Sequence, residues 1–144
     1  MNLNHALLIV DAQMNMFNED ISVYQANQLI KTLQKLVKQA RLRGVPVIWV
    51  RNNGGNGDPD EPGTHGWEFN PILEPNKAEI VIDKHKPSAF KGTNLMLELE
   101  QKEITHLVIA GMQTEICINS TARQAVELGF KVIIVEDGHS TFDS

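Results

Sequence analysis

The sequence predicts a three-layer α/β/α fold, in which helices cover both faces of an open, mostly parallel sheet. Three observations support this prediction. Short apolar segments read as buried strands, stretches with helical spacing lie between them, and polar or small residues follow each apolar segment directly. The length of 144 residues suits one domain, which we assign to residues 1–144.

Five apolar segments recur along the chain. They are almost continuously apolar rather than alternating, which is typical of strands that are covered on both faces of a parallel sheet. Four are clear: Ala6–Val10, Val45–Val50, Leu107–Ala110 and Val132–Val135. Glu79–Ile82 is a weaker fifth segment. We therefore predict five strands.

Three helices are predicted between these segments. The first has an apolar stripe at helical spacing, formed by Leu29, Ile30, Leu33, Leu36, Val37 and Ala40. Ser22 and Gln25 form a candidate capping box at its start, and Gly44 is a natural stop. The second has a predicted buried stripe of Ile118, Ala122, Ala125 and Val126, and it ends at Gly129. A shorter helix is predicted over Thr93–Gln101.

Composition excludes several classes of function. A formal net charge of −5 provides no electrostatic reason to bind nucleic acid or an anionic membrane. The longest apolar runs are too short to span a bilayer, and the first residues do not resemble a secretory signal. The single cysteine cannot form an internal disulfide. We therefore expect a soluble, cytoplasmic protein.

The segment 52–75 differs from the rest of the chain, because it holds four of the six prolines and five of the ten glycines. It is long for a connection between a strand and the next element, and such loops are often functional. We predict an ordered loop over the carboxyl ends of the strands, where ligands bind in open parallel sheets. The alternative is a mobile surface insert.

Cys117 is the candidate nucleophile. If Thr114 caps the second large helix, Cys117 lies in its first turn, where backbone N–H groups and the helix dipole favour the thiolate. The alternative is that this cysteine is only a small buried apolar side chain.

Charged residues at two other strand ends could act with Cys117. Asp11 follows an apolar segment and could serve as a general base, or it could be a helix cap or part of a buried ion pair. Lys84 and Lys86 are alternative cations that could favour the thiolate, although such a charged cluster is usually a solvated turn. His85 could instead act as the base.

Four motifs together resemble the isochorismatase-like cysteine hydrolases. The first is Val10-Asp11-Ala12-Gln13 followed by Phe17, and the second is Gly63-Thr64-His65-Gly66-Trp67-Glu68. The third is Lys84-His85-Lys86-Pro87-Ser88-Ala89-Phe90 followed by Gly92-Thr93, and the fourth is Gly111-Met112-Gln113-Thr114-Glu115-Ile116-Cys117. Their order and spacing agree with the family over essentially the whole chain.

The resemblance implies a Rossmann-like fold and a catalytic triad of Asp11, Lys84 and Cys117. It also implies a cis peptide between Met112 and Gln113, and an oxyanion hole made by the backbone N–H groups of Gln113 and Cys117. The implied reaction is hydrolysis of a small amide or related C–N bond through a thioester. Candidate walls of the substrate pocket are Gln13, Phe17, Trp67, Phe90 and Ile116, for which ordinary packing is the alternative.

The sequence departs from the family in two respects. Metal-binding nicotinamidases of this superfamily carry Asp-x-His after the second strand, whereas this chain reads Arg51-Asn52-Asn53 there. We therefore expect no metal and no cofactor. Family members usually continue with a further helix and strand, so we expect the C-terminal part to be short and one sheet edge to be open. Homo-oligomers are common in the family, and we expect one here.

Two other functions compete with the hydrolase. A catalytically silent family member would bind a small molecule or a protein without turning it over. A thiol redox protein would need an external thiol, because the chain has no second cysteine.

Overall fold

The structure, a computed structural model, describes residues 4–10, 12, 13, 23–111 and 115–139. Side chains are described for these residues except 23–26, 115–118 and 136–139. The strands are β1 (His5–Val10), β2 (Val47–Asn52), β3 (Ile80–Lys84), β4 (His106–Gly111) and β5 (Lys131–His139). The helices are α1 (Val23–Leu42), α2 (Leu95–Gln101) and α3 (Glu115–Glu127), and two short 3-10 turns cover His65–Trp67 and Pro71–Leu73.

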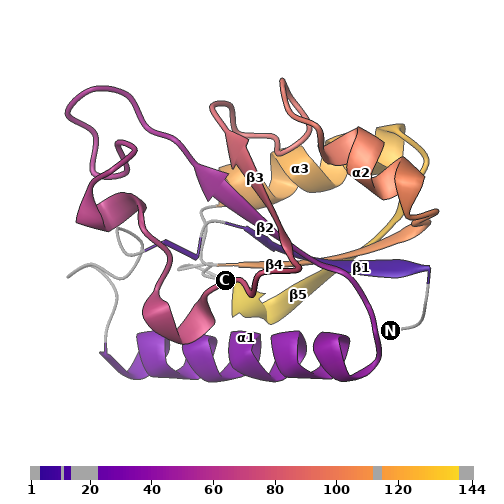
Figure 1. Cartoon of the computed structure of the whole chain (residues 1–144), viewed down its shortest axis with the longest axis horizontal. Helices are drawn as coiled ribbons and strands as arrows, with labels where there is room; N and C mark the ends of the chain where they lie inside the picture. Colours follow the sequence, from indigo (N-terminus) through magenta and orange to yellow (C-terminus); the bar gives the residue numbers. More distant parts are fainter. Residues whose placement is uncertain (1–3, 11, 14–22, 112–114, 140–144) are drawn as a thin grey trace.

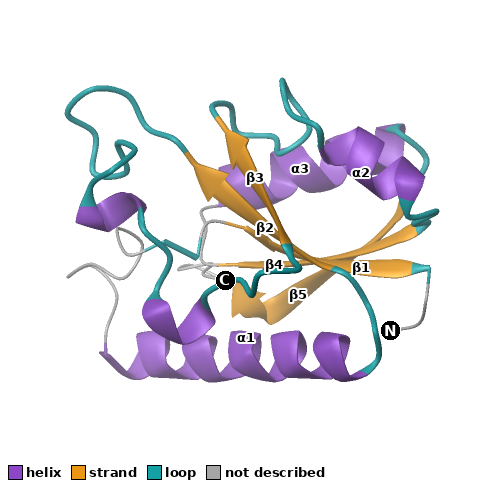
Figure 2. Cartoon of the chain, viewed as in Figure 1, coloured by secondary structure: helices purple, strands orange, loops and turns teal. Residues whose placement is uncertain are grey.

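The five strands form one sheet in the order β3-β2-β1-β4-β5, and every neighbouring pair is parallel. Helix α1 covers one face, while α2 and α3 cover the other (Figures 1 and 2). The predicted three-layer α/β/α fold is therefore confirmed. None of the described helices has the length and apolarity that a membrane span needs.

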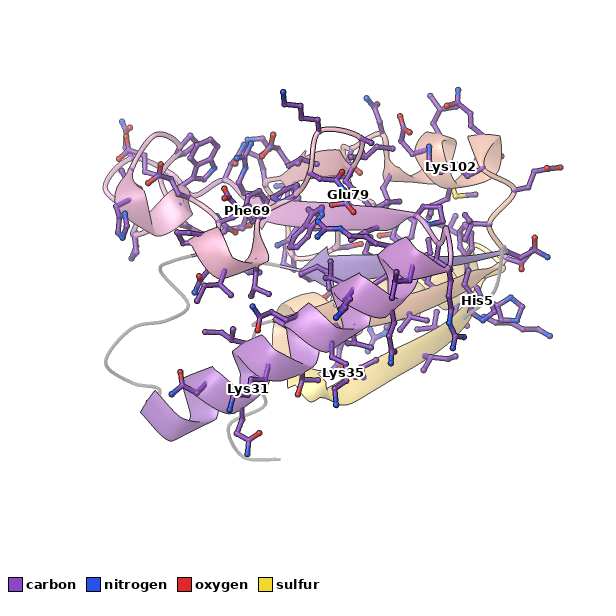
Figure 3. The ribbon with its side chains drawn as sticks, turned by 60° about the horizontal axis from the view of Figure 1, so that its bottom comes forward. His5, Lys31, Lys35, Phe69, Glu79 and Lys102 are labelled. Carbon is purple, nitrogen blue, oxygen red and sulfur yellow. The ribbon has the colours of Figure 1, made fainter. Side chains whose placement is uncertain are left out.

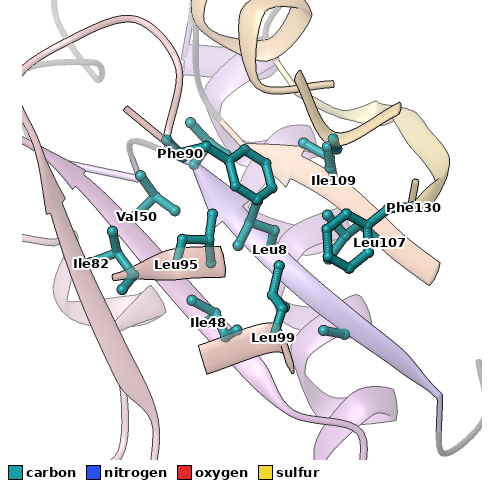
Figure 4. Close-up of a cluster of buried hydrophobic side chains, with 14 of the residues drawn as sticks. Leu8, Ile48, Val50, Ile82, Phe90, Leu95, Leu99, Leu107, Ile109 and Phe130 are labelled. Atoms are coloured by element: carbon teal, nitrogen blue, oxygen red, sulfur yellow. The ribbon is translucent and has the colours of Figure 1, made fainter. Parts of the chain in front are cut away.

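Alternate residues of the central strands enter two separate cores. Leu7 and Ile9 of β1 face α1, where Leu33 and Ala40 pack against the sheet. Residues Ala6, Leu8 and Val10 face the other side. There, Leu95 and Leu99 of α2, Ala122 and Ala125 of α3, and the rings of Phe90 and Phe130 complete the core (Figure 4). Burial on both faces explains why the strands are continuously apolar.

Both predicted glycine stops are confirmed. Gly44 has φ of 72°, and the N–H of Val45 donates to the carbonyl of Ala40 at 2.9 Å, which is the geometry of a Schellman motif. Gly129 has φ of 99° and ends α3 in the same way. Glycine suits both positions because a Cβ disfavours positive φ. Ser22, the predicted cap of α1, lies outside the described residues.

One predicted core residue is wrong. Val126 is 60% exposed, whereas Ala122 and Ala125 on the same helix are buried as predicted. Position 126 is turned by about 100° from position 125 on a helix, which places it at the edge of the buried stripe. Nothing among the described residues covers that edge.

Candidate active site

The sheet register aligns the strand ends that carry the candidate residues. Val10, which precedes Asp11 in the sequence, pairs with Val50 of β2 and with Gly111 of β4. Lys84 pairs with Asn52 at the end of β2. The carboxyl ends of four neighbouring strands therefore meet at one edge of the sheet, as ligand sites in open parallel sheets require.

Lys84 is the cation that the fold places inside the molecule. Its side chain is completely buried, whereas Lys86 and His85 are exposed. Side chains two residues apart on a strand share a face, so Lys84 points to the same side as Ile82, the side covered by α2 and α3. A buried ammonium is costly without polar partners, and its Nζ donates to Asn52 Oδ1 at 3.1 Å. This burial favours Lys84 over Lys86 for a role at the site.

Cys117 is the third residue of α3, which begins at Glu115. The first four N–H groups of a helix have no acceptor within the helix, and its N-terminus carries partial positive charge. The predicted position of Cys117 in a first turn is therefore confirmed. Its side chain lies outside the described part of the structure, and so do Asp11, Phe17, Met112, Gln113 and Thr114. The predicted triad contacts, cis peptide and oxyanion hole stay predictions.

Gln13, a predicted pocket residue, is completely buried and joins β1 to the long loop. Its amide accepts from the N–H of Asn52 at 2.8 Å and donates to the carbonyl of Asn52 at 2.9 Å. It also donates to the carbonyl of Trp67 at 2.9 Å, and it pairs with Phe69 in an isolated antiparallel bridge. In the described structure Gln13 therefore holds the loop against the end of β2.

The loop leaves β2 at the carboxyl end of that strand (Figure 1), and hydrogen bonds of Gln13 and Asn52 tie it back to that end. Trp67 is half-buried within it, and its Nε1 donates to Asn53 Oδ1 at 2.7 Å. The guanidinium of Arg51 lies 3.8 Å from the centre of the Trp67 ring and also pairs with Asp83 at 2.7 Å. These contacts fix Trp67 beside the ends of β2 and β3.

Phe90, another predicted pocket wall, packs in the core beneath α2 and α3. It is 8% exposed, and its ring stacks against Phe130 with 6.1 Å between the ring centroids (Figure 4). This position favours packing over a pocket role. The side chain of Ile116, the remaining predicted pocket wall, lies outside the described part of the structure.

Two polar residues at this edge were missed from the sequence. Asn52 links Lys84 to Asp60, because its Nδ2 donates to Asp60 Oδ2 at 2.5 Å. Asp60 lies in the middle of the loop and is only 8% exposed. No group of three His, Cys, Asp or Glu side chains that could hold a metal ion occurs in the part of the chain that the structure describes.

Comparison with known proteins identifies related chains. The model of the isochorismatase domain matches residues 5–144. A streptothricin hydrolase of Streptomyces noursei is 35% identical over 138 residues, which are 96% of this chain and 50% of that protein. The chain thus spans about half the length of this relative.

Solved structures of the family share the fold. A crystal structure of an isochorismatase from Pseudomonas putida KT2440 superposes with a TM-score of 0.89 at 31% identity, covering 96% of this chain and 72% of that one. N-carbamoylsarcosine amidase from Thermoplasma acidophilum superposes with a TM-score of 0.86 at 27% identity, covering 97% and 84%. Because the domain match extends over nearly the whole chain and the sheet and helices superpose on these structures, the chain belongs to the isochorismatase family.

Proposed function

We propose that this chain hydrolyses an amide or related C–N bond of a small molecule through a thioester on Cys117. Asp11 acts as the acid and base, and Lys84 is the cation that stabilises the charges of Asp11 and of the Cys117 thiolate. Relatives named as a streptothricin hydrolase and an N-carbamoylsarcosine amidase support the class of reaction.

The observation that carries the proposal is the burial of Lys84 at the carboxyl end of β3. Lysine is rarely fully buried, and a buried ionisable group in such a place is a recognised mark of functional sites. The start of α3 supports the same proposal, because a helix N-terminus favours the thiolate of a cysteine in its first turn.

The proposed reaction has two stages. Asp11 takes the thiol proton, the sulfur of Cys117 forms a bond to the carbonyl carbon, and the C–N bond breaks as Asp11 returns the proton to the leaving nitrogen. Asp11 then takes a proton from water, whose oxygen attacks the thioester and releases the acid. The C–S bond breaks in this step, and the thiol regains its proton from Asp11.

Backbone N–H groups would stabilise the oxyanion in both stages. We assign this role to Gln113 and Cys117. The N–H of Cys117 suits it because no carbonyl earlier in α3 can accept from it. One such donor contributes about 3–4 kcal/mol to catalysis in enzymes where it has been removed. Of the predicted pocket walls, Trp67 has the best-supported position, since its ring is fixed beside the ends of β2 and β3.

The test is release of ammonia or amine from a panel of small amides. The panel includes N-carbamoyl amino acids and streptothricin, and the wild type is compared with Cys117→Ala. We expect release by the wild type and a loss of at least about 1,000-fold in the variant, because the covalent route is closed. Equal release by both proteins would rule out the thioester. If no amide is hydrolysed but the protein still binds one of them, the result would favour a catalytically silent binding protein.

A further inference from the structure

The hydrogen bonds around Lys84 continue beyond the proposed triad. Asn52 and Lys84 are paired in register at the ends of β2 and β3, and Asn52 Oδ1 accepts from Lys84 Nζ at 3.1 Å. On its other side, Asn52 Nδ2 donates to Asp60 Oδ2 at 2.5 Å. One amide group therefore connects a fully buried ammonium to a carboxylate that is 8% exposed.

The chemistry of the two neighbours determines the orientation of this amide. A lysine ammonium only donates hydrogen bonds, and a carboxylate only accepts them. The oxygen of Asn52 must therefore face Lys84, and its nitrogen must face Asp60. The reverse orientation would place two donors together at one end and two acceptors at the other. Asp60 thus keeps the acceptor of Asn52 directed at the lysine.

The backbone of Asn52 is held as firmly as its side chain. Gln13 accepts from the Asn52 N–H at 2.8 Å and donates to the Asn52 carbonyl at 2.9 Å. Gln13 itself is completely buried, so these bonds are at least partly shielded from water. Neither the backbone nor the amide of Asn52 can shift without breaking one of its hydrogen bonds.

Gly54 allows the loop to close over Asp60. Its N–H donates to the carbonyl of Asp60 at 2.9 Å, and a Cβ at this position would overlap Asp60 Oδ1. The loop backbone therefore lies directly against the carboxylate. A side chain at residue 54 would displace the Asp60 carboxylate from this position.

We propose that Asn52 and Asp60 are positioning residues for Lys84, Asn52 by accepting from its ammonium and Asp60 by orienting the Asn52 amide. This inference rests on the proposed function, since it gives Lys84 its role beside Cys117. It links the long loop to the reaction: the loop carries the carboxylate that keeps the buried lysine in place. Loss of this positioning should lower kcat much more than it raises KM, because neither residue is assigned a contact with the substrate.

The test exchanges the two side chains. Asn52→Asp sets a carboxylate against Asp60, so we expect kcat to fall about tenfold. In the double variant Asn52→Asp with Asp60→Asn, the new carboxylate at residue 52 accepts from Lys84, and the new amide at residue 60 donates to that carboxylate. We therefore expect kcat to return to within about threefold of wild type, with KM nearly constant throughout. Each substitution keeps the shape of the side chain, so the variants should fold.

Asn56→Asp is the matched control. Asn56 is an exposed residue of the same loop, and in the described structure no hydrogen bond joins its side chain to Lys84, Asp60 or Trp67. We expect kcat of this variant to stay within about twofold of wild type, as for most surface changes. A fall as large as that of Asn52→Asp, or a double variant no better than Asn52→Asp alone, would overturn the proposal.

A second readout separates this proposal from the proposed function. The chain has one cysteine, so the rate of alkylation by iodoacetamide reports on Cys117 alone. We expect this rate to fall in Asn52→Asp and to recover in the double variant, whether or not an amide substrate is found. Absence of amide release with this pattern of alkylation would reject the hydrolase but keep the positioning role. Equal alkylation rates in all variants would reject the positioning role.

Discussion

Lys84 and Lys86 lie two residues apart on the chain, but only Lys84 is buried. Under the proposed function, Lys84→Met removes the cation that favours the thiolate while keeping a side chain of similar length. We expect amide turnover and the alkylation rate of Cys117 both to fall at least about tenfold, measured as initial rates at one pH. The free energy of unfolding should change by no more than about 2 kcal/mol, because losing a hydrogen bond and losing a buried charge have opposite effects.

Lys86→Met is the control for this substitution. Its side chain is exposed, so we expect unchanged turnover and a change in unfolding free energy within about 0.5 kcal/mol. If turnover falls equally in both variants, the loss reflects net charge or substrate attraction, and Lys84 has no special role.

Single residues show where sequence reasoning reaches its limit. The motif Lys84-His85-Lys86 contains two equivalent cations in sequence terms, and the structure distinguishes them because β3 ends at Lys84. Asn52 and Asp60 were missed for a different reason. Their hydrogen bonds join residues from two strands and a loop, so no local pattern of residue types marks them.

At the scale of elements, β1 and β4 lie against each other where both strands end, at Val10 and Gly111. Gly111 is buried and pairs with Val10, and a Cβ there would overlap the carbonyl oxygen of Val10. The obstacle is backbone in a central strand, so it can move only if β1 and β4 separate. We expect Gly111→Ala to lower the free energy of unfolding by about 1–3 kcal/mol, measured as a shift of the urea midpoint with an unchanged slope.

Gly55→Ala is the matched control. Gly55 is exposed in the loop, its φ is not positive, and the nearest atom to an added Cβ would be Asp58 Oδ2 at 3.4 Å. We expect its unfolding free energy to stay within about 0.5 kcal/mol of wild type. If Gly111→Ala is as stable as Gly55→Ala, the prediction is wrong, and β1 and β4 can separate at their ends at little cost in free energy.

The elements themselves were largely predictable, because the central strands β1, β2 and β4 are buried on both faces and the helices are amphipathic. All five strands occur within two residues of their predicted starts. The path of the loop could not be predicted, since it depends on long-range polar contacts such as those of Gln13 and Arg51. The prediction for Val126 was wrong because residue 126 lies about 100° round the helix from Ala125, at an edge of the buried stripe that the sequence pattern does not define.

At the scale of the whole molecule, Glu79 joins three parts of the chain. Its carboxylate accepts from Arg41 of α1 at 2.7 and 2.8 Å, from Trp49 Nε1 of β2 at 2.9 Å and from the N–H of Asn76 at 3.0 Å. Figure 3 shows Glu79 on the side of the sheet that faces α1. The side chain of Glu79 is only 9% exposed, so this cluster fixes the returning loop to both the helix and the sheet.

We expect Glu79→Gln to destabilise the whole domain. The amide loses the charge that pairs with Arg41, and one of its two hydrogen-bonding atoms becomes a donor facing other donors. A hydrogen bond to a charged group contributes about 1.5–3 kcal/mol, and we expect a value at the low end because the Arg41 bonds are exposed. The free energy of unfolding from urea titration at about pH 7 should fall by that amount.

The loss should depend on pH with a definite sign. Burial alone would raise the pKa of Glu79, but hydrogen bonds from Arg41, Asn76 and Trp49 lower it below the ordinary value of 4.5. The unfolded chain therefore binds the proton first as pH falls, so the stabilisation by Glu79 is complete above about pH 5 and is lost progressively below about pH 4.5. The difference between wild type and Glu79→Gln should shrink at about pH 3.5. Glu74→Gln, an exposed side chain in the same loop, should match wild type at both pH values, and an equal loss there would refute the role of Glu79.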